Sequence, residues 1–273
     1  MIDYAESLKI IRKHAKEISE EPCALETAVG RIAYKTIVSP EVVPPFANSA
    51  MDGFALRSSE LDVSEFALLG SIAAGDAPRT TESEQGAWEI MTGAPLPLGF
   101  DTVIKVEDTK LINGRIQLSR TPTKGENVRP AGEDFQEGSP ALERGTRIEP
   151  QHLLVLATLG ISEISVYRRP NVSIISTGSE LESFKSKKLT PGCIRNSTAP
   201  YLVAELTALG AKVEYHGVVG DQPSEFFPVF RRVLESKPDL LITPGAVSMG
   251  KYAFVTPAMI DLGREDVERR FDR

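Results

Sequence analysis

The spacing of apolar residues changes at Arg169-Pro170, and this change constrains the fold more than any other feature. From about residue 45 to 128, glycines separate short apolar runs, which is typical of the strands of a small barrel or sandwich. After residue 170, strand-like runs alternate with amphipathic helices, and this alternation predicts a parallel sheet with right-handed crossovers. The elements expected there are strands at 172–176, 213–219 and 239–243 and helices at 200–209 and 224–236.

Other elements are predicted from short signals. Asn113-Gly114 lies between two apolar runs, a combination that strongly favours a hairpin. Asp3 is expected to begin a helix that runs to about Ser19, because acidic residues are favoured in a first turn. A proline at the start of an apolar run and a glycine after its end predict a buried helix over residues 150–159. His152, near the start of that helix, is expected to be structural.

The composition narrows the classes of function. The length of 273 residues suggests about two domains, and the net charge is −7. Cationic residues are scattered except in the run Lys185-Ser186-Lys187-Lys188, so the basic face of a nucleic-acid-binding protein is not expected. An anionic small molecule is compatible with this charge, because backbone amides and a few arginines can bind anions in an acidic protein.

The sequence has the features of a cytoplasmic protein. Its two cysteines, Cys23 and Cys193, lie far apart and form no metal-binding or redox spacing, as expected in a reducing compartment. The N-terminus is charged and lacks the apolar core of a signal peptide. No stretch approaches the roughly 18 apolar residues of a membrane span, so a membrane is not expected as a partner.

One acidic residue stands out in the segment Pro44–Arg57, which reads PPFANSAMDGFALR. Two prolines force an extended approach to it, and Gly53 is expected to adopt a backbone angle that other residues resist. Asp52 is therefore predicted at the tip of a rigid turn before a strand. The alternative is that Asp52 only closes the turn.

Two glycine loops follow strands of the predicted parallel sheet, where ligand sites of such sheets lie. They span residues 175–180 and 242–250. Each is expected to offer free backbone amides and a hydroxyl to a phosphate or oxyanion. Neither is a Walker loop, because no Gly-Lys-Ser/Thr follows at the required spacing. The alternative is that both are simple tight turns.

Carboxylates and two further loops complete the candidate sites. Glu180 and Asp221 each follow a strand end, where their oxygens could hold Mg²⁺, although Asp221 could instead be a turn or cap residue. The segments 91–97 and 125–134 resemble site loops: the first is stiffened by prolines and the second places an arginine near acidic residues. Charged, glycine-rich loops are more often only solvated, which is the alternative for both.

These motifs together resemble the molybdopterin molybdenumtransferase family, which comprises MoeA of bacteria and the E domain of gephyrin in animals. The resemblance rests on five separated motifs in the family's order, PPFANSAMDGFALR, MTGAPLP, GENVRPAGED, ISTGSEL and ITPGAVSMG. The segment PGCIRNSTAPYL, between the last two, fits as well. The resemblance extends from the first expected helix to about Val255.

The resemblance implies a multidomain fold of the α/β and β classes. An elongated α+β N-terminal region, residues 1–44 and 129–169, would carry an inserted small β-barrel domain, residues 45–128. A three-layer α/β molybdopterin-binding domain, residues 170–273, would follow. This last domain is expected to be incomplete, because the family's later motifs and its C-terminal β domain do not occur in the sequence.

The implied activity is a step of molybdenum cofactor biosynthesis. Members of the family insert molybdate into adenylated molybdopterin and release AMP in a step that depends on Mg²⁺. The family is dimeric, with the cleft between subunits, so a homodimer is expected, together with contacts to other cofactor-biosynthesis proteins. Two alternatives stay open: a catalytically impaired molybdopterin-binding or scaffold homologue, and an unrelated nucleotide-binding α/β enzyme.

Functional positions follow from the resemblance residue by residue. The implied catalytic residues are Asp52, Thr92, Asp134, Glu180 and Asp221, of which Glu180 and Asp221 are also the implied metal ligands. The implied substrate-binding residues are Ser49, Arg129, Thr177, Gly178, Asn196, Ser197, Gly245, Ser248 and Gly250. The sequence departs from the family pattern at Ser179, at Thr198 and at Ala253, where an acidic residue is usual.

Overall fold

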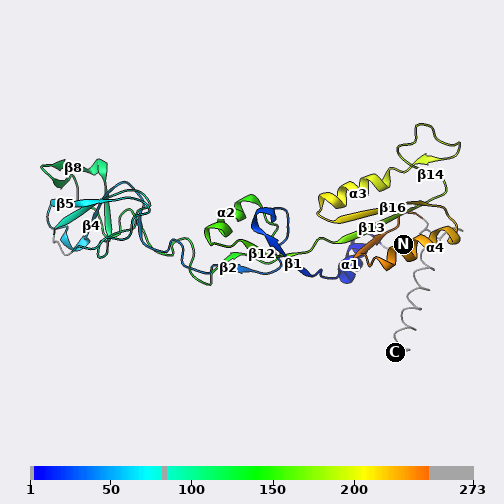
Figure 1. Ribbon diagram of the computed structural model, residues 1–273, viewed down its shortest axis with the longest axis horizontal. Helices are drawn as coiled ribbons and strands as arrows, with labels where there is room; N and C mark the ends of the chain where they lie inside the picture. Colours follow the sequence, from blue (N-terminus) through cyan, green and yellow to red (C-terminus); the bar gives the residue numbers. More distant parts are fainter. Residues whose placement is uncertain (1–2, 82–84, 246–273) are drawn as a thin grey trace, which may run out of the picture. The chain divides into compact units, whose positions relative to one another are not determined.

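A computed structural model describes residues 3–81 and 85–245 of the chain (Figure 1). The chain divides into two compact units. We call residues 23–164 the barrel unit, and residues 1–22 together with 165–273 the α/β unit. Among the described residues, no helix is long and apolar enough to cross a membrane.

The barrel unit is built on a six-stranded sheet. Its strands are β4 (Gly53–Leu56), β5 (Glu65–Ile72), β6 (Gly86–Ile90), β7 (Thr102–Lys105), β8 (Thr109–Ile112) and β9 (Arg115–Leu118). They are ordered β7-β4-β6-β5-β9-β8, and all neighbours are antiparallel except β5 and β6. The β8–β9 turn is the predicted Asn113-Gly114 hairpin, with positive φ at both residues as a type I′ turn requires.

Both faces of β4 are buried, which explains its uninterrupted apolar run Phe54–Leu56. Phe54 and Leu56 pack on one face with Phe66 of β5. Ala55 belongs to a second cluster on the other face, which includes Phe100 and other residues of the loop that follows β6. The loop therefore covers one of the two hydrophobic cores of the barrel unit.

Shorter elements complete the barrel unit. They are η1 (Leu25–Thr27), β2 (Ile37–Val38), β3 (Asn48–Ser49), η2 (Ser58–Glu60), η3 (Val106–Asp108), β10 (Val128–Arg129), β11 (Pro140–Leu142) and α2 (Pro150–Thr158). The helix predicted at 150–159 is thus confirmed. The structural interpretation of His152 is also confirmed, because its Nδ1 accepts a hydrogen bond of 3.0 Å from the Glu149 amide and caps α2. The chain leaves the unit through β1 (Glu20–Ala24) and β12 (Glu163–Tyr167), which pair with each other.

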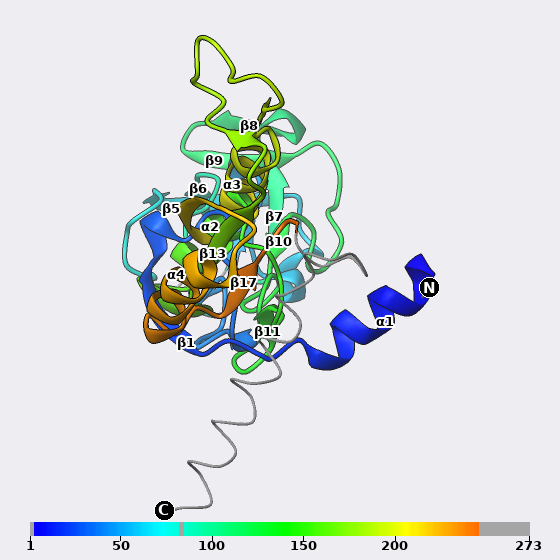
Figure 2. The same ribbon diagram turned by 90° about the vertical axis from the view of Figure 1, so that its right-hand side faces the viewer.

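The α/β unit contains a parallel sheet ordered β16-β13-β17. Its strands are β13 (Asn171–Thr177), β16 (Lys212–Val219) and β17 (Leu240–Ile242), and its helices are α3 (Thr198–Ala208) and α4 (Pro223–Glu235). Figures 1 and 2 show α3 and α4 on opposite faces of the sheet, as right-handed crossovers to the two sides of β13 require. Phe226 and Phe230 of α4 stack with their ring centroids 5.1 Å apart in the buried core. The predicted alternation is confirmed.

The first helix is shorter than predicted. Asp3 caps α1 (Tyr4–His14) by accepting a hydrogen bond of 2.8 Å from the Glu6 amide, but the helix ends at His14 rather than near Ser19. Ala15 is extended, and the carbonyl of Ser19 accepts a hydrogen bond of 3.0 Å from the Arg168 amide. Residues 15–19 are therefore not helical, because this segment is hydrogen-bonded beside the end of β12.

The predicted fold class is confirmed as a β-rich N-terminal region followed by a parallel α/β domain. The finer division into residues 1–44 with 129–169, 45–128 and 170–273 stays a prediction. The last of those ranges extends into residues 246–273, which lie outside the described part of the chain.

Candidate functional site

Asp52 lies on an exposed turn immediately before β4. Its Oδ1 accepts two hydrogen bonds of 2.7 Å from Thr92, one from the amide and one from the hydroxyl. These bonds, the amide bond first, lower the pKa of Asp52 below its ordinary value. Both bonds end on Oδ1, and within the described part of the chain the other carboxylate oxygen is left available to a ligand.

Two neighbours fix this turn. Ser49 is buried, and its hydroxyl donates a hydrogen bond of 2.6 Å to the Met51 carbonyl. Gly53 is required for a different reason from the predicted one, since its φ is not in the left-handed region. A Cβ at Gly53 would lie only 2.0 Å from the Ile104 carbonyl oxygen, so close packing of β4 on β7 excludes any side chain.

Three of the sequence motifs meet at β3. The Ser49 carbonyl accepts a hydrogen bond of 2.8 Å from Gly93, and the Ala50 amide donates one of 2.9 Å to Asn127. Arg129 pairs with Asn48 across β10 and β3. Segments 44–57, 91–97 and 125–134 therefore form one structure, which argues against treating the last two as independent solvated loops.

Arg129 and Asp134 bind each other in this structure. The guanidinium of Arg129 donates hydrogen bonds of 2.8 and 2.9 Å to the two oxygens of Asp134 and one of 2.8 Å to Glu133. The carboxylates raise the pKa of Arg129, Glu133 having the larger effect. The arginine implied to bind substrate and the acid implied in catalysis are thus a surface ion pair.

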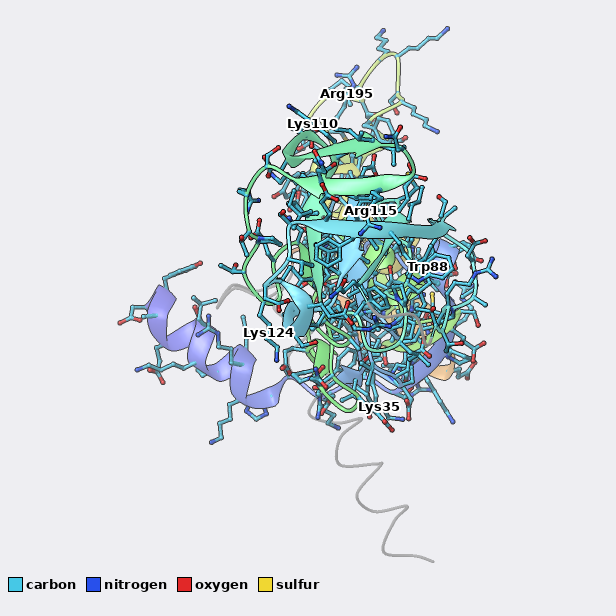
Figure 3. All side chains as sticks on the ribbon, turned by 90° about the vertical axis from the view of Figure 1, so that its left-hand side faces the viewer. Lys35, Trp88, Lys110, Arg115, Lys124 and Arg195 are labelled. Atoms are coloured by element: carbon cyan, nitrogen blue, oxygen red, sulfur yellow. The ribbon has the colours of Figure 1, made fainter. Side chains whose placement is uncertain are left out.

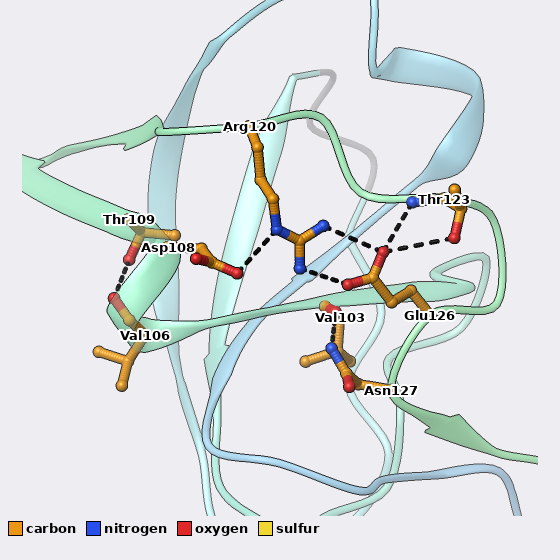
Figure 4. Close-up of polar contacts among 8 residues, drawn as sticks. All are labelled: Val103, Val106, Asp108, Thr109, Arg120, Thr123, Glu126 and Asn127. Carbon is orange, nitrogen blue, oxygen red and sulfur yellow. Dashed lines mark hydrogen bonds and ion pairs between the residues drawn. The ribbon is translucent and has the colours of Figure 1, made fainter.

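A second arginine, which the sequence analysis missed, anchors the start of segment 125–134 (Figure 4). Arg120 donates to Asp108 at 2.8 Å and binds both oxygens of Glu126. The bonds from Arg120 are the main cause that lowers the pKa of Glu126 to about 2. No local signal identifies this network, because Arg120 lies outside the motifs and its partners come from separate turns.

In the α/β unit, the strand ends meet as predicted, but their amides are not free. Thr177 donates to the Pro244 carbonyl through its amide at 3.2 Å and through its hydroxyl at 3.0 Å. The Gly178 amide donates to Val219 at 3.1 Å. The expectation that loop 175–180 offers free amides is wrong for these residues, because neighbouring strand ends take up the donors.

Glycine is nevertheless required in both loops. Gly178 has φ +148° and Gly245 has φ +98°, which are strained for other residues. A Cβ at Gly245 would also lie 2.6 Å from the Thr177 carbonyl oxygen. The glycines allow the two loops to pack against each other.

Ser179 precedes Glu180 in the chain and is hydrogen-bonded to Asp221. The Ser179 amide donates to the Asp221 carboxylate at 2.9 Å, and the Asp221 amide donates to the Ser179 hydroxyl at 3.1 Å. Among the described residues, no group of three or more His, Cys, Asp or Glu side chains could enclose a metal ion. Mg²⁺ commonly binds one or two carboxylates and takes its remaining ligands from water and substrate phosphate, and Glu180 and Asp221 stay its predicted ligands.

Asn196 is buried with every amide proton in use. Its Nδ2 donates to the Ser176 hydroxyl and to the Tyr215 hydroxyl, each at 2.9 Å. Its Oδ1 accepts a hydrogen bond of 3.1 Å from Ala199, so Asn196 fixes the start of α3, where Ser197 is the N-cap. Sequence reasoning identified Asn196 but not its two hydroxyl partners, which come from other strands.

A cavity of about 200 Å³ opens beside these loops. It is lined by Ser176, Thr177, Glu180, Leu181, Ile194, Arg195, Asn196, Ser197, Thr198, Pro244 and Gly245. The lining combines hydroxyls, one carboxylate and one guanidinium, which are groups able to hold a polar, anionic ligand. Arg195 was not singled out from the sequence, although it lies inside PGCIRNSTAPYL.

The implied site residues form two groups. Ser49, Asp52, Thr92, Arg129 and Asp134 lie in the barrel unit. Thr177, Gly178, Glu180, Asn196, Ser197, Asp221 and Gly245 lie in the α/β unit. Ser248 and Gly250, as well as Ala253, fall outside the described residues. The roles of all these residues stay predictions.

Comparisons with known proteins cover both units. Residues 2–160 match the MoeA N-terminal region, domains I and II, and residues 173–271 match a probable molybdopterin-binding domain. The molybdopterin molybdenumtransferase of Synechococcus elongatus is 34% identical over 98% of this chain and 68% of its own length. That of Bacillus subtilis is 35% identical over 95% of this chain, which spans only 62% of it.

A solved structure supports the same assignment. The molybdopterin biosynthesis MoeA protein of Pyrococcus horikoshii is 28% identical and superposes with a TM-score of 0.83. The match covers 90% of this chain and 66% of the Pyrococcus chain. Because the first family match alone covers more than half of the sequence, the chain belongs to the MoeA family.

Proposed function

We propose that this protein acts in molybdenum cofactor biosynthesis, inserting molybdate into adenylated molybdopterin with release of AMP. The observation that carries the proposal is the pair formed by Asp52 and Thr92, two family-motif residues 40 positions apart that meet at 2.7 Å on an exposed turn. The names of the Synechococcus and Bacillus relatives support the reaction class.

The α/β unit supplies the substrate side of the proposed reaction. Its cavity, with Glu180, Arg195 and the hydroxyl of Ser197, would hold the phosphate end of the pterin substrate. Glu180 and Asp221 would hold Mg²⁺ jointly with substrate oxygens, and the bound ion would neutralise charge on the phosphoanhydride that water cleaves to release AMP.

Asp52 supplies proton transfer in this proposal. When two dithiolene thiols replace one oxygen of molybdate, they lose two protons, and the departing oxygen gains two to leave as water. The Asp52 carboxylate, kept ionised by Thr92, accepts a proton from a thiol through its available oxygen and returns it to the departing oxygen. Thr92 acts by orienting the carboxylate.

The compartment, the oligomeric state and the partners that we propose are those of the family. The protein works in the cytoplasm as a homodimer, and other cofactor-biosynthesis proteins deliver and receive its ligands. With the cleft between subunits, as in the family, several of the implied site residues would meet only across the subunit interface.

Release of AMP tests the proposal directly. Purified protein is incubated with adenylated molybdopterin, molybdate and Mg²⁺, and AMP and molybdenum-loaded product are quantified. Loss of a proton-transfer group typically costs about 10²-fold or more in rate, which we expect for Asp52→Asn. The control is Asp62→Asn, which removes an exposed carboxylate of the same unit. Wild-type protein without product, or an Asp52→Asn variant at full rate, would refute the proposal.

A catalytically impaired homologue is the second candidate, and Ala253 favours it because the family usually has an acid there. Such a protein would bind molybdopterin without turnover. Restoring the acid by Ala253→Asp discriminates the two: a gain of AMP release from an inactive wild type identifies an impaired enzyme.

A further inference from the structure

The loop between β14 (Leu181–Glu182) and β15 (Ile194–Arg195) carries three lysines and no acidic residue in an acidic chain. We call residues 183–193 the basic loop. It carries Lys185, Lys187 and Lys188, all exposed, and Figures 1 and 2 show it projecting beyond β14 and α3. The chain as a whole has a net charge of −7, so this concentration of cations is a local feature.

Hydrogen bonds give the basic loop a defined shape. The Thr190 amide donates to the Glu182 carboxylate at 2.9 Å, which closes the loop at its base. The Arg195 guanidinium donates to the Ser186 carbonyl at 2.8 and 3.2 Å. In Figure 3, Arg195 lies at the base of the projecting loop. The lysines are therefore held on a structured loop, which lowers the entropy lost when they bind a ligand.

The basic loop begins and ends beside the cavity. Leu181 before it, and Ile194 and Arg195 after it, all line the cavity that also contains Glu180. The Glu180 carboxylate in the lining would repel a polyanion unless cations offset its charge. Arg195 in the lining offsets one negative charge, and the lysines of the basic loop, which begins and ends beside the cavity, add further positive charge. A positive field of this kind raises the local concentration and association rate of anions.

We propose that the basic loop captures the polyanionic end of the ligand and guides it into the cavity. The ligand class is a diphosphate ester, and this identification rests on the function proposed above. The lysines act on ligand capture through charge, and Arg195, besides lining the cavity, holds the loop through its hydrogen bonds to Ser186.

Pyrophosphate binding tests this inference without turnover. Binding of inorganic pyrophosphate to the whole protein is measured by calorimetry in Mg²⁺-free buffer at low salt and at about 1 M NaCl, where the screening length is about 3 Å. The test variant is Lys185→Gln/Lys187→Gln/Lys188→Gln. The control is Lys13→Gln/Lys16→Gln/Lys110→Gln, which makes the same change in net charge with exposed lysines outside the loop. Thermal melting of each variant confirms that it is folded.

The expected result is affinity about tenfold lower for the loop variant at low salt, with a shallower salt dependence. The control should bind like the wild type. Equal affinities for loop variant and wild type, an equal loss in the control, or no pyrophosphate binding by the wild type would overturn the inference. AMP release distinguishes the two proposals: turnover without loop-dependent binding rejects only this one, and loop-dependent binding without turnover rejects only the proposed reaction.

Discussion

Asp52 depends on a single neighbour for its low pKa, and this dependence can be measured. In Thr92→Val the hydroxyl donor is lost while the amide remains, so the pKa of Asp52 should rise toward its ordinary value. Because the folded-state pKa of Asp52 is lowered, the hydrogen bonds from Thr92 stabilise the fold at pH values above the ordinary pKa of an aspartate. This stabilisation is lost as the pH falls through the lowered pKa. NMR titration of the carboxyl carbon measures the shift. Thr92→Ser keeps the hydroxyl and should keep the pKa low, whereas an unchanged pKa in Thr92→Val would contradict the assignment.

The steric requirement for glycine at position 53 can be tested with a single substitution. A methyl group there would meet the Ile104 carbonyl oxygen at 2.0 Å, and backbone must move to admit it. Gly53→Ala should lower the free energy of unfolding by about 3 kcal/mol, the upper end of the usual cost of overpacking. Gly114→Ala is the matched control, because its Cβ meets nothing within 4 Å and only its positive φ adds strain of about 1 kcal/mol. Denaturant unfolding that ranks the two variants equally would be evidence against the steric explanation.

At the scale of an element, Arg120 holds segment 120–129 to η3. The folded-state pKa of Glu126 is about 2, below its ordinary value of 4.5, so its stabilisation is present above pH 4.5 and is lost between about pH 4.5 and 2. Since Arg120 is two-fifths exposed, solvent screening keeps the contribution of this ion pair to stability small. Arg120→Gln should therefore be less stable at pH 7 and equal to the wild type near pH 2. A pH-independent difference, measured by urea unfolding, would assign the effect to packing instead.

Elements whose structure depends on residues close together in the chain could be predicted from the sequence. Hydrogen bonds between residues far apart in the chain could not. Asn113-Gly114 carries its turn in its own backbone preferences, and the alternation after residue 170 reflects burial of each strand and helix. The amides of Thr177 and Gly178 looked free because their acceptors, Pro244 and Val219, are 40 or more residues away in the chain. The motifs identified Asp52 and Thr92 through the family resemblance, whereas Arg120 lies outside the motifs and was missed, although its partners are only 6 and 12 residues away.

For the whole molecule, the two units have separate hydrophobic cores. Phe66 lies in a cluster made only of barrel-unit residues and Phe226 in one made only of α/β-unit residues, and both side chains are fully buried. Removing a buried phenylalanine costs about 3–5 kcal/mol, and distant sites without shared partners act independently. Phe66→Ala should therefore destabilise the barrel unit alone, and Phe226→Ala the α/β unit alone.

Hydrogen exchange measured by mass spectrometry resolves the two units, because local opening depends on local stability. In Phe66→Ala, exchange should accelerate in β4, β5, β6 and β9 and stay unchanged in β13, β16 and β17. The reverse is expected for Phe226→Ala, so each variant is the control for the other. Accelerated exchange in both units from either substitution would show that the units unfold as one cooperative structure. The stability of each core would then depend on that of the other.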